Sequence, residues 1–219
     1  MKAMILAAGR GERMRPLTDS TPKPLLEVRG KPLIVWHIER LAKAGFEEIV
    51  INIAHLSEQI PQKLGDGFAW GVKIHYSDES QEGALESAGG IVKALPLLGE
   101  EPFLVVNADV FCDYNFDTDF KLEEKLAHLV LVENPEHNRE GDFGLENSCV
   151  LNKAKKKYTF SGIAYYNPKL FENLDVKKLP LAPLLREKIE KKEVSGELFN
   201  GLWHDIGTPQ RLNEINRRE

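Results

Sequence analysis

The chain has 219 residues, of which 42% are hydrophobic, and it carries a formal net charge of −5 at pH 7. This length and composition support a sizeable core, and we expect a single domain spanning residues 1–219. The acidic balance argues against a general nucleic-acid-binding protein, whose phosphate contacts require a basic surface. No run of about eighteen apolar residues occurs, and two lone cysteines fit a reducing compartment, so we expect a cytoplasmic protein without a membrane span.

Strand-like and helical patterns alternate through the first half of the chain. Strands are predicted at 3–7, 48–53, 72–76 and 103–107, with helices at 32–45, after Ser57 as an N-cap, and after Ser87. This alternation predicts a parallel sheet that helices cover on both faces. The second half adds predicted strands at 128–132 and 159–166, and predicted helices at 182–192 and 208–218, the last capped by Thr208.

The first predicted strand ends in the segment "GRGERMR", which combines flexible backbone with positive charge. Gly9 and Gly11 lack Cβ atoms, so their backbone N–H groups can approach an anion closely. Arg13 adds a fixed charge and paired donors. The segment lacks the third glycine of the dinucleotide-binding fingerprint, and the chain has no GK[ST] sequence of a Walker A loop. Both of these common phosphate-binding loops are therefore excluded. A tight turn with surface arginines would account for the same residues.

Lys23 lies between Pro22 and Pro24. Each proline fixes its own φ and restricts the residue before it, so the backbone around the lysine is stiff. A solvated lysine gains nothing from this restraint, whereas a lysine that binds a phosphate loses less entropy on binding. We therefore interpret Lys23 as a phosphate-binding residue.

Two aspartates follow apolar segments far apart in the chain. Asp109 comes directly after the predicted strand at 103–107, at the sheet edge where ligands bind in open α/β folds. Asp205 lies in "WHDIGT", shortly before the last predicted helix. Two converging carboxylates commonly hold Mg²⁺ on triphosphate oxygens, although a loop-capping or helix-start aspartate would also suit each position.

These motifs together resemble the sugar-1-phosphate nucleotidyltransferase family, whose members open with LAAGxGxR(M/L)xPLT followed by PKP(L/M). The chain has "LAAGRGERMRPLT" and "PKPLL", and the resemblance continues through "LESAGGI", "LVVNADV", "FSGIAYY" and "WHDIGTPQRL". The resemblance implies a Rossmann-like three-layer α/β/α sandwich with a mostly parallel mixed sheet, of the nucleotide-diphospho-sugar transferase type. It also implies transfer of a nucleotidyl group to a sugar 1-phosphate, with Mg²⁺ as the cofactor.

The resemblance further implies roles for individual residues. Arg13, Lys23 and Asp109 would be catalytic, Asp109 and Asp205 would hold the metal, and Arg13 would bind the departing pyrophosphate. The nucleotide would contact Leu6, Ala7, Ala8, Gly9, Gly11, Arg13 and Lys23, with Glu79, Gln81 and Glu86 as open candidates for reading the base. The sugar would contact Asn107, Gly144, Ser161 and Gly162.

One departure from the family pattern concerns the sugar phosphate. Many relatives carry a Glu-Lys-Pro segment whose lysine reaches this phosphate, and the corresponding interval here, "LENSCVLNKAKKKYTF", contains none. Lys157 is one replacement, and Lys23 together with the metal is another. The size of the chain and its motifs most resemble those family members that use UTP and N-acetylmuramate 1-phosphate in cell-wall recycling. The muramate carboxylate would need a cation, for which Arg139 and the lysines of 153–157 are candidates.

Several other functions remain open at this stage. Within the same fold, the chain could transfer GMP to mannose 1-phosphate or CMP to phosphocholine. An inactive relative that binds nucleotide and regulates a partner is a third possibility, although Arg13, Lys23, Asp109 and Asp205 are all present. A serine hydrolase using Ser161 and His204 lacks the GxSxG elbow. We expect small-molecule substrates, no nucleic acid or membrane partner, and a monomer or weak homo-oligomer.

Overall fold

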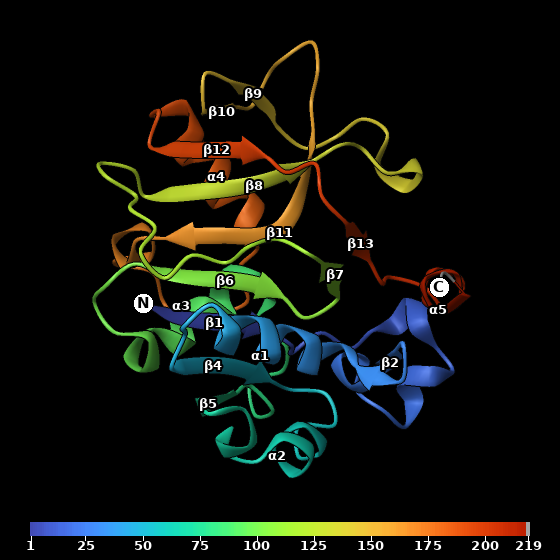
Figure 1. The fold of residues 1–219 in the computed structure, drawn as a ribbon. Helices are drawn as coiled ribbons and strands as arrows, with labels where there is room; N and C mark the ends of the chain where they lie inside the picture. Colours follow the sequence, from blue (N-terminus) through green and yellow to red (C-terminus); the bar gives the residue numbers. More distant parts are fainter. Residues whose placement is uncertain (218–219) are drawn as a thin grey trace.

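The computed structural model describes residues 1–217 and shows one large twisted sheet with helices on both faces (Figure 1). Nine strands of this part of the chain form the sheet. In spatial order they are β5 (Lys73–Asp78), β4 (Glu48–Ile53), β1 (Lys2–Leu6), β6 (Phe103–Asn107), β11 (Thr159–Tyr166), β8 (Ala127–Val132), β12 (Val194–Leu198), β10 (Cys149–Leu151) and β9 (Gly144–Glu146).

The sheet is parallel in its first half and mixed in its second. Strands β5, β4, β1 and β6 run parallel, and β11 lies antiparallel between β6 and β8. The predicted strands at 48–53, 103–107 and 159–166 match the observed bounds, and the other predicted strands lie within two residues of theirs. Their near-continuous apolar sequences suit a sheet that is buried on both faces.

Helices α1 (Leu33–Lys43) and α2 (Gln59–Leu64) cover one face, and α3 (Glu86–Leu98) and α4 (Leu181–Glu190) cover the other. Ile38 and Leu41 of α1 pack on Ile5 and Ile51 of the sheet. Opposite them, Ile91 of α3 packs with Met4 and Val50, which point to the other face. This arrangement confirms the predicted three-layer sandwich.

Smaller elements complete the edge at which the parallel strands end. They are the paired strands β2 (Glu27–Val28) and β3 (Lys31–Pro32), the paired strands β7 (Val110–Cys112) and β13 (Trp203–Asp205), and α5 (Pro209–Arg217). A separate small core that includes Met14, Phe111, Ile206 and Leu212 packs α5 against this edge. The hydroxyl of Thr208 accepts from the Arg211 backbone N–H at 3.3 Å, as predicted for the helix cap. Residue 218 of the predicted helix lies outside the described residues.

Short 3-10 turns occur at η1 (Glu12–Met14), η2 (Leu17–Asp19), η3 (Lys23–Leu25), η4 (Phe68–Trp70), η5 (Glu136–Asn138) and η6 (Pro168–Phe171). The prediction that Ser57 caps α2 is wrong. The helix begins after Glu58 without a side-chain cap, because a backbone bond from Gln59 N–H to the Leu56 carbonyl already closes the preceding turn. None of the helices in residues 1–217 has the length and apolar character needed to cross a membrane.

Candidate active site

A cleft of about 600 Å³ opens at the carboxyl ends of β1, β4 and β6, where the structure gathers segments from six parts of the chain. Ligands in open α/β sheets bind at this edge, and the volume is typical of small-molecule sites. The cleft is lined by every predicted nucleotide-binding residue except Gln81, together with Asn107, Asp109 and Gly207. Gln81 is exposed and lies outside the lining.

The glycine loop after β1 forms one wall of the cleft. Gly11 has a φ of +62°, and a Cβ there would lie 2.9 Å from Cγ2 of Thr18, so a side chain would be both strained and crowded. Its carbonyl accepts from the Thr18 hydroxyl and the Met14 N–H, each at 2.8 Å. Gly9 faces open space, because nothing lies within 4 Å of the point that a Cβ would occupy. The loop is thus a fixed turn that leaves exposed backbone toward the cleft.

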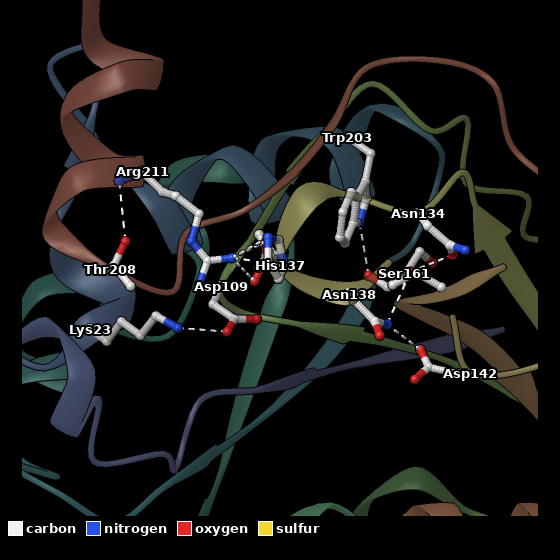
Figure 2. A network of polar contacts seen from close by, with 12 residues as sticks. Lys23, Asp109, Asn134, His137, Asn138, Asp142, Ser161, Trp203, Thr208 and Arg211 are labelled. Carbon is white, nitrogen blue, oxygen red and sulfur yellow. Dashed lines mark hydrogen bonds and ion pairs between the residues drawn. The ribbon is translucent and has the colours of Figure 1, made fainter. Parts of the chain in front are cut away.

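Lys23 lies beside the glycine loop, with its Cβ 3.2 Å from the point that a Cβ on Gly11 would occupy, and it also lines the cleft. It lies in η3, directly after Pro22, whose extended φ and ψ of −61° and 139° set the start of the turn. Its ammonium donates to Oδ2 of Asp109 at 2.6 Å, and 13% of the lysine side chain is exposed (Figure 2). The cation therefore lies beside the carboxylate that we predicted as a metal ligand.

Asp109 and Asp205 lie on neighbouring backbone segments, although their side chains contact different groups. Strand β13 pairs with β7 so that Asp205 is opposite Val110, and the Ile206 N–H donates to the Asp109 carbonyl at 2.7 Å. The Asp109 carboxylate faces the cleft, whereas Asp205 lines an adjacent pocket. Gly207 lies at the boundary, where a Cβ would stand 3.3 Å from Oδ2 of Asp205.

The carboxylate of Asp205 contacts two basic side chains, those of Arg211 and His137. Nη1 of Arg211 lies 2.6 Å from both carboxylate oxygens, and Nε2 of His137 lies 3.0 Å from Oδ1. Figure 2 shows Arg211 reaching from α5 toward His137 and the region beside Asp109. Sequence reasoning missed both partners, and the i to i+6 spacing of Asp205 and Arg211 gives no signal for them.

The carboxylates of Asp109 and Asp205 have the donor chemistry that suits Mg²⁺. Carboxylate oxygens are its preferred protein ligands, and it commonly takes one or two of them and completes its shell with water and substrate phosphates. Within residues 1–217 no group of three or more His, Cys, Asp or Glu side chains could hold a metal without such help. Asp109 and Asp205 could therefore supply two of the ligands of such an ion, with water or phosphate oxygens as the others.

Glu79, one of the candidates for reading the base, is a buried residue of the cleft lining. Its side chain has no exposed surface, and its two oxygens accept from Asn52 Nδ2 at 2.7 Å and from the Leu85 N–H at 2.8 Å. Oδ1 of Asn52 in turn accepts from the Ala7 N–H at 2.7 Å. Burial raises the pKa of Glu79, and the two hydrogen bonds oppose this shift. The network joins the glycine loop to the segment 79–85.

His37 lies beneath the site, and sequence reasoning missed it as well. It is 2% exposed, and neither of its ring nitrogens has a hydrogen-bond partner within the described residues. Burial lowers the pKa of His37 to about 4, and the Val110 backbone and, less strongly, the Asp109 charge offset part of this shift. The imidazole is therefore neutral at pH 7 and places no second cation beside Asp109.

The predicted sugar-binding residues separate into two groups. Asn107 lines the cleft, and Gly162, with a φ of +79°, packs so closely that a Cβ would lie 2.7 Å from Nδ2 of Asn107. Ser161 is 1% exposed, and its Oγ accepts from the Ile163 N–H, which argues against a serine nucleophile. A β-bulge at this point of β11 explains both features, because the register shifts between Phe160 and Ile163.

The other predicted sugar residues lie away from the cleft. A Cβ on Gly144 would stand 2.3 Å from the Ala154 Cβ, so this glycine permits close packing next to the β9–β10 hairpin. The backbone carbonyls of Arg139 and Lys157 accept from Nδ2 of Asn134 at 3.1 and 2.9 Å. Neither residue lines the cleft or the cavity that adjoins it.

A second cavity of about 460 Å³ continues from the cleft through Glu86, Ser87 and Asn107, which line both. Phe160 belongs to the motif "FSGIAYY", whereas most of the other residues that line this cavity carry no predicted role. Beyond the three shared residues, the lining consists of Asp142, Phe143, Phe160, Pro180, Leu181, Ala182, Leu185 and Arg186.

Comparison with known proteins gives consistent matches along the whole chain. Residues 2–219 match the family described as Nucleotidyl transferase. The N-acetylmuramate alpha-1-phosphate uridylyltransferase of Neisseria meningitidis serogroup B is 55% identical over 98% of this chain and 96% of its own length. The mannose-1-phosphate guanylyltransferase catalytic subunit beta of Drosophila melanogaster is 31% identical over 95% of this chain, which spans 60% of that protein.

A solved structure supports the fold independently. The CTP:phosphocholine cytidylyltransferase of Streptococcus pneumoniae superposes with a TM-score of 0.76, covering 98% of this chain and 97% of that one. The two sequences are 24% identical, so this likeness concerns the fold alone. The shared fold agrees with the predicted nucleotide-diphospho-sugar transferase type.

Proposed function

The chain belongs to the nucleotidyl transferase family, and we propose that it transfers UMP from UTP to N-acetylmuramate 1-phosphate. The observation that carries the proposal is the cleft, in which the glycine loop, Arg13, Lys23 and Asp109 lie together at one sheet edge. The 55% identical relative from Neisseria meningitidis supports the choice of base and sugar. The mannose-1-phosphate relative is more distant, and this chain spans 60% of it.

The proposed reaction is an in-line displacement at phosphorus. An oxygen of the sugar phosphate forms a bond to the α-phosphorus of UTP, while the bond from that phosphorus to the bridging oxygen of the β-phosphate breaks. Pyrophosphate leaves with the electron pair of this bond. The attacking oxygen is already anionic near pH 7, so the main barrier is the approach of anions rather than the removal of a proton.

The residues of the cleft meet this requirement through charge and position. Backbone N–H groups of the glycine loop would bind the nucleotide, Arg13 would bind the departing pyrophosphate, and Lys23 would contact phosphate oxygens near the reacting centre. Asp109 and Asp205 would hold Mg²⁺, which supplies positive charge that favours the pentavalent transition state. Lys23 already neutralises Asp109, so the ammonium is held in place before substrate binds.

We also propose that this reaction takes place in the cytoplasm and supplies a cell-wall sugar nucleotide, with the enzyme acting as a monomer or weak homo-oligomer. The net charge of −5 supports small-molecule substrates rather than nucleic acid. A purely regulatory nucleotide-binding protein would not need Arg13, Lys23 and Asp109 grouped around one cleft.

A turnover assay tests the proposal. Pyrophosphate release is measured for UTP, GTP and CTP, each against N-acetylmuramate 1-phosphate, N-acetylglucosamine 1-phosphate and mannose 1-phosphate. We expect UTP with N-acetylmuramate 1-phosphate to be the preferred pair, and chelation of divalent metal to abolish turnover reversibly. Preference for another pair would reject the substrate assignment.

An isosteric variant tests the metal role separately. Asp109→Asn keeps the shape of the side chain and removes its charge, so we expect turnover to fall by about 100-fold or more. Asp119→Asn, an exposed aspartate outside both the cleft and the second cavity, is the matched control and should retain normal turnover. Normal activity of Asp109→Asn would reject the metal assignment.

A further inference from the structure

The second cavity presents an apolar floor and a charged rim. Phe143, Phe160, Leu181 and Leu185 supply apolar surface, and Arg186 is the one cationic side chain among the described residues that line it. The cavity joins the cleft at Asn107, two positions before Asp109 in the chain. A hexose whose 1-phosphate lies in the cleft would therefore extend toward this cavity.

Helix α4 fixes the position of Arg186. Leu181, Leu185 and Ile189 recur on one face of the helix and are buried in the core, which anchors it against the sheet. Ala182 and Arg186 are four residues apart, so they lie on one neighbouring face, and both line the cavity. The small Ala182 side chain leaves space on the helix turn before the guanidinium.

The guanidinium of Arg186 has little bonding of its own. Its carbon lies 4.9 Å from the centroid of the Phe143 ring, and its two terminal nitrogens are 3.5 Å from Oδ1 of Asn152 and from the Asp142 carbonyl. These two contacts are at the outer limit for hydrogen bonds. Most of the five N–H donors are therefore free to bind a planar anion, while the ring supports the guanidinium.

The two carboxylates on the cavity wall have other partners. Oδ2 of Asp142 accepts from the Phe160 N–H at 2.8 Å and from Nδ2 of Asn138 at 3.3 Å. Glu86 pairs with Lys178 at 3.5 Å. Neither carboxylate forms an ion pair with Arg186, so no carboxylate of the cavity wall competes with a ligand for the guanidinium.

We propose that Arg186 recognises the carboxylate of the sugar substrate, the lactyl group that distinguishes N-acetylmuramate from N-acetylglucosamine. The inference rests on the proposed function and adds the residue that reads the acidic substituent. A carboxylate would accept two parallel hydrogen bonds from the fork of the guanidinium above Phe143. Arg139 and Lys157, the candidates from sequence, line neither the cavity nor the cleft and are replaced by Arg186 in this role.

Equilibrium binding of the two products tests this directly. UDP-N-acetylmuramate and UDP-N-acetylglucosamine differ only in the lactyl ether, so titration calorimetry with both ligands isolates the contribution of the carboxylate. We expect Arg186→Gln to weaken binding of UDP-N-acetylmuramate by about tenfold or more, as for the loss of a charged hydrogen bond. Binding of UDP-N-acetylglucosamine should change by less than about twofold. Arg186→Lys should fall between wild type and Arg186→Gln, because it keeps the charge but lacks the fork.

A second variant leaves the arginine in place. Ala182→Glu puts a carboxylate one turn away, where it can pair with Arg186, and should weaken binding of the muramate nucleotide selectively. Lys191→Gln is the control, since Lys191 terminates the same helix, pairs with Glu187 at 2.6 Å and lies outside the cavity. It should leave binding of both nucleotides unchanged.

The outcomes separate the two proposals. Equal weakening of both nucleotides by Arg186→Gln, or no weakening of either, would overturn the role of Arg186 while the substrate assignment stands. The proposed function itself would be overturned if the wild-type enzyme turned over the 1-phosphate of a sugar without a carboxylate but did not turn over N-acetylmuramate 1-phosphate. The need for a carboxylate-binding residue would then disappear as well.

Discussion

The ammonium of Lys23 donates to the carboxylate of Asp109 across 2.6 Å, although 86 positions separate the two residues in the chain. The lysine comes from a proline-bounded turn, and the aspartate follows the central strand β6. The fold thus holds a cation and an anion together at the edge where phosphates would bind. Both groups keep some contact with solvent, with 13% and 31% of their side chains exposed, so a ligand can reach them.

Replacing Lys23 should affect turnover far more than stability. Lys23→Gln removes the cation that would contact phosphate oxygens, and we expect kcat to fall by about 100- to 1000-fold. The loss of a partly exposed ion pair should change the free energy of unfolding by about 1 kcal/mol at most. Steady-state kinetics and urea denaturation measure the two effects. Lys31→Gln, which breaks the Lys31–Glu39 pair elsewhere, is the control; a similar loss of kcat in both variants would contradict the assignment.

Arg211 should compete with metal for Asp205. Its Nη1 lies 2.6 Å from both carboxylate oxygens, so a cation can bind them only after the guanidinium moves. We expect Arg211→Gln to tighten Mn²⁺ binding to the nucleotide-free protein by about fivefold, which corresponds to about 1 kcal/mol for a charge pair near water. Titration calorimetry with Mn²⁺ measures this.

Arg217→Gln removes the same charge from the exposed end of the same helix and should leave Mn²⁺ binding nearly unchanged. Weaker Mn²⁺ binding in Arg211→Gln would show instead that the guanidinium orients Asp205 for the metal.

Glu79 should act as a positioning residue rather than a base reader. Both of its oxygens accept from buried donors, so the amide group of Glu79→Gln would face one of those donors with its own N–H₂. We expect the variant to lose about 1–3 kcal/mol of unfolding free energy. Its KM values for UTP and GTP should rise by the same factor, because the glycine loop and the segment 79–85 lose their connection without losing a base contact.

Urea denaturation and kinetics with both nucleotides check this prediction. Glu82→Gln is the control, since its carboxylate is on the exposed part of the same segment and pairs with Lys93. A selective loss of UTP over GTP in Glu79→Gln would mean that Glu79 reads the base after all.

Gly162 should be intolerant of a side chain because of its neighbour. With a φ of +79°, alanine there costs about 1–2 kcal/mol of backbone strain, and its Cβ would also displace the amide of Asn107. We expect Gly162→Ala to lower kcat/KM for the sugar phosphate by about tenfold to a hundredfold, since small misplacements of binding groups are costly.

Gly99→Ala provides a matched comparison for the strain. Gly99 has a φ of +88° with nothing within 4 Å of a Cβ, so alanine there strains the backbone without displacing any neighbour. Thermal melting and kinetics of the two variants separate strain from displacement. Equal kinetic effects would show that the contact with Asn107 has no part in substrate binding.

Local sequence patterns determined the sheet and its covering helices. The apolar runs at 48–53, 103–107 and 159–166 match β4, β6 and β11 because a strand buried on both faces needs uninterrupted apolar residues, whatever its neighbours are. The placement of Asp109 at a strand end, and the stiffness around Lys23, are likewise properties of a few consecutive residues. The family follows from motifs spread along the whole chain.

Only the tertiary structure decided which side chains face one another. Glu79 and Gln81 are two positions apart in one segment, yet one is buried in a hydrogen-bond network and the other is exposed. Arg186 lines a cavity beside the cleft, whereas Arg139 and Lys157, the latter in a lysine-rich run, do not. Side-chain direction depends on how helices and loops pack across the sheet, and contacts between distant segments leave no trace in local composition.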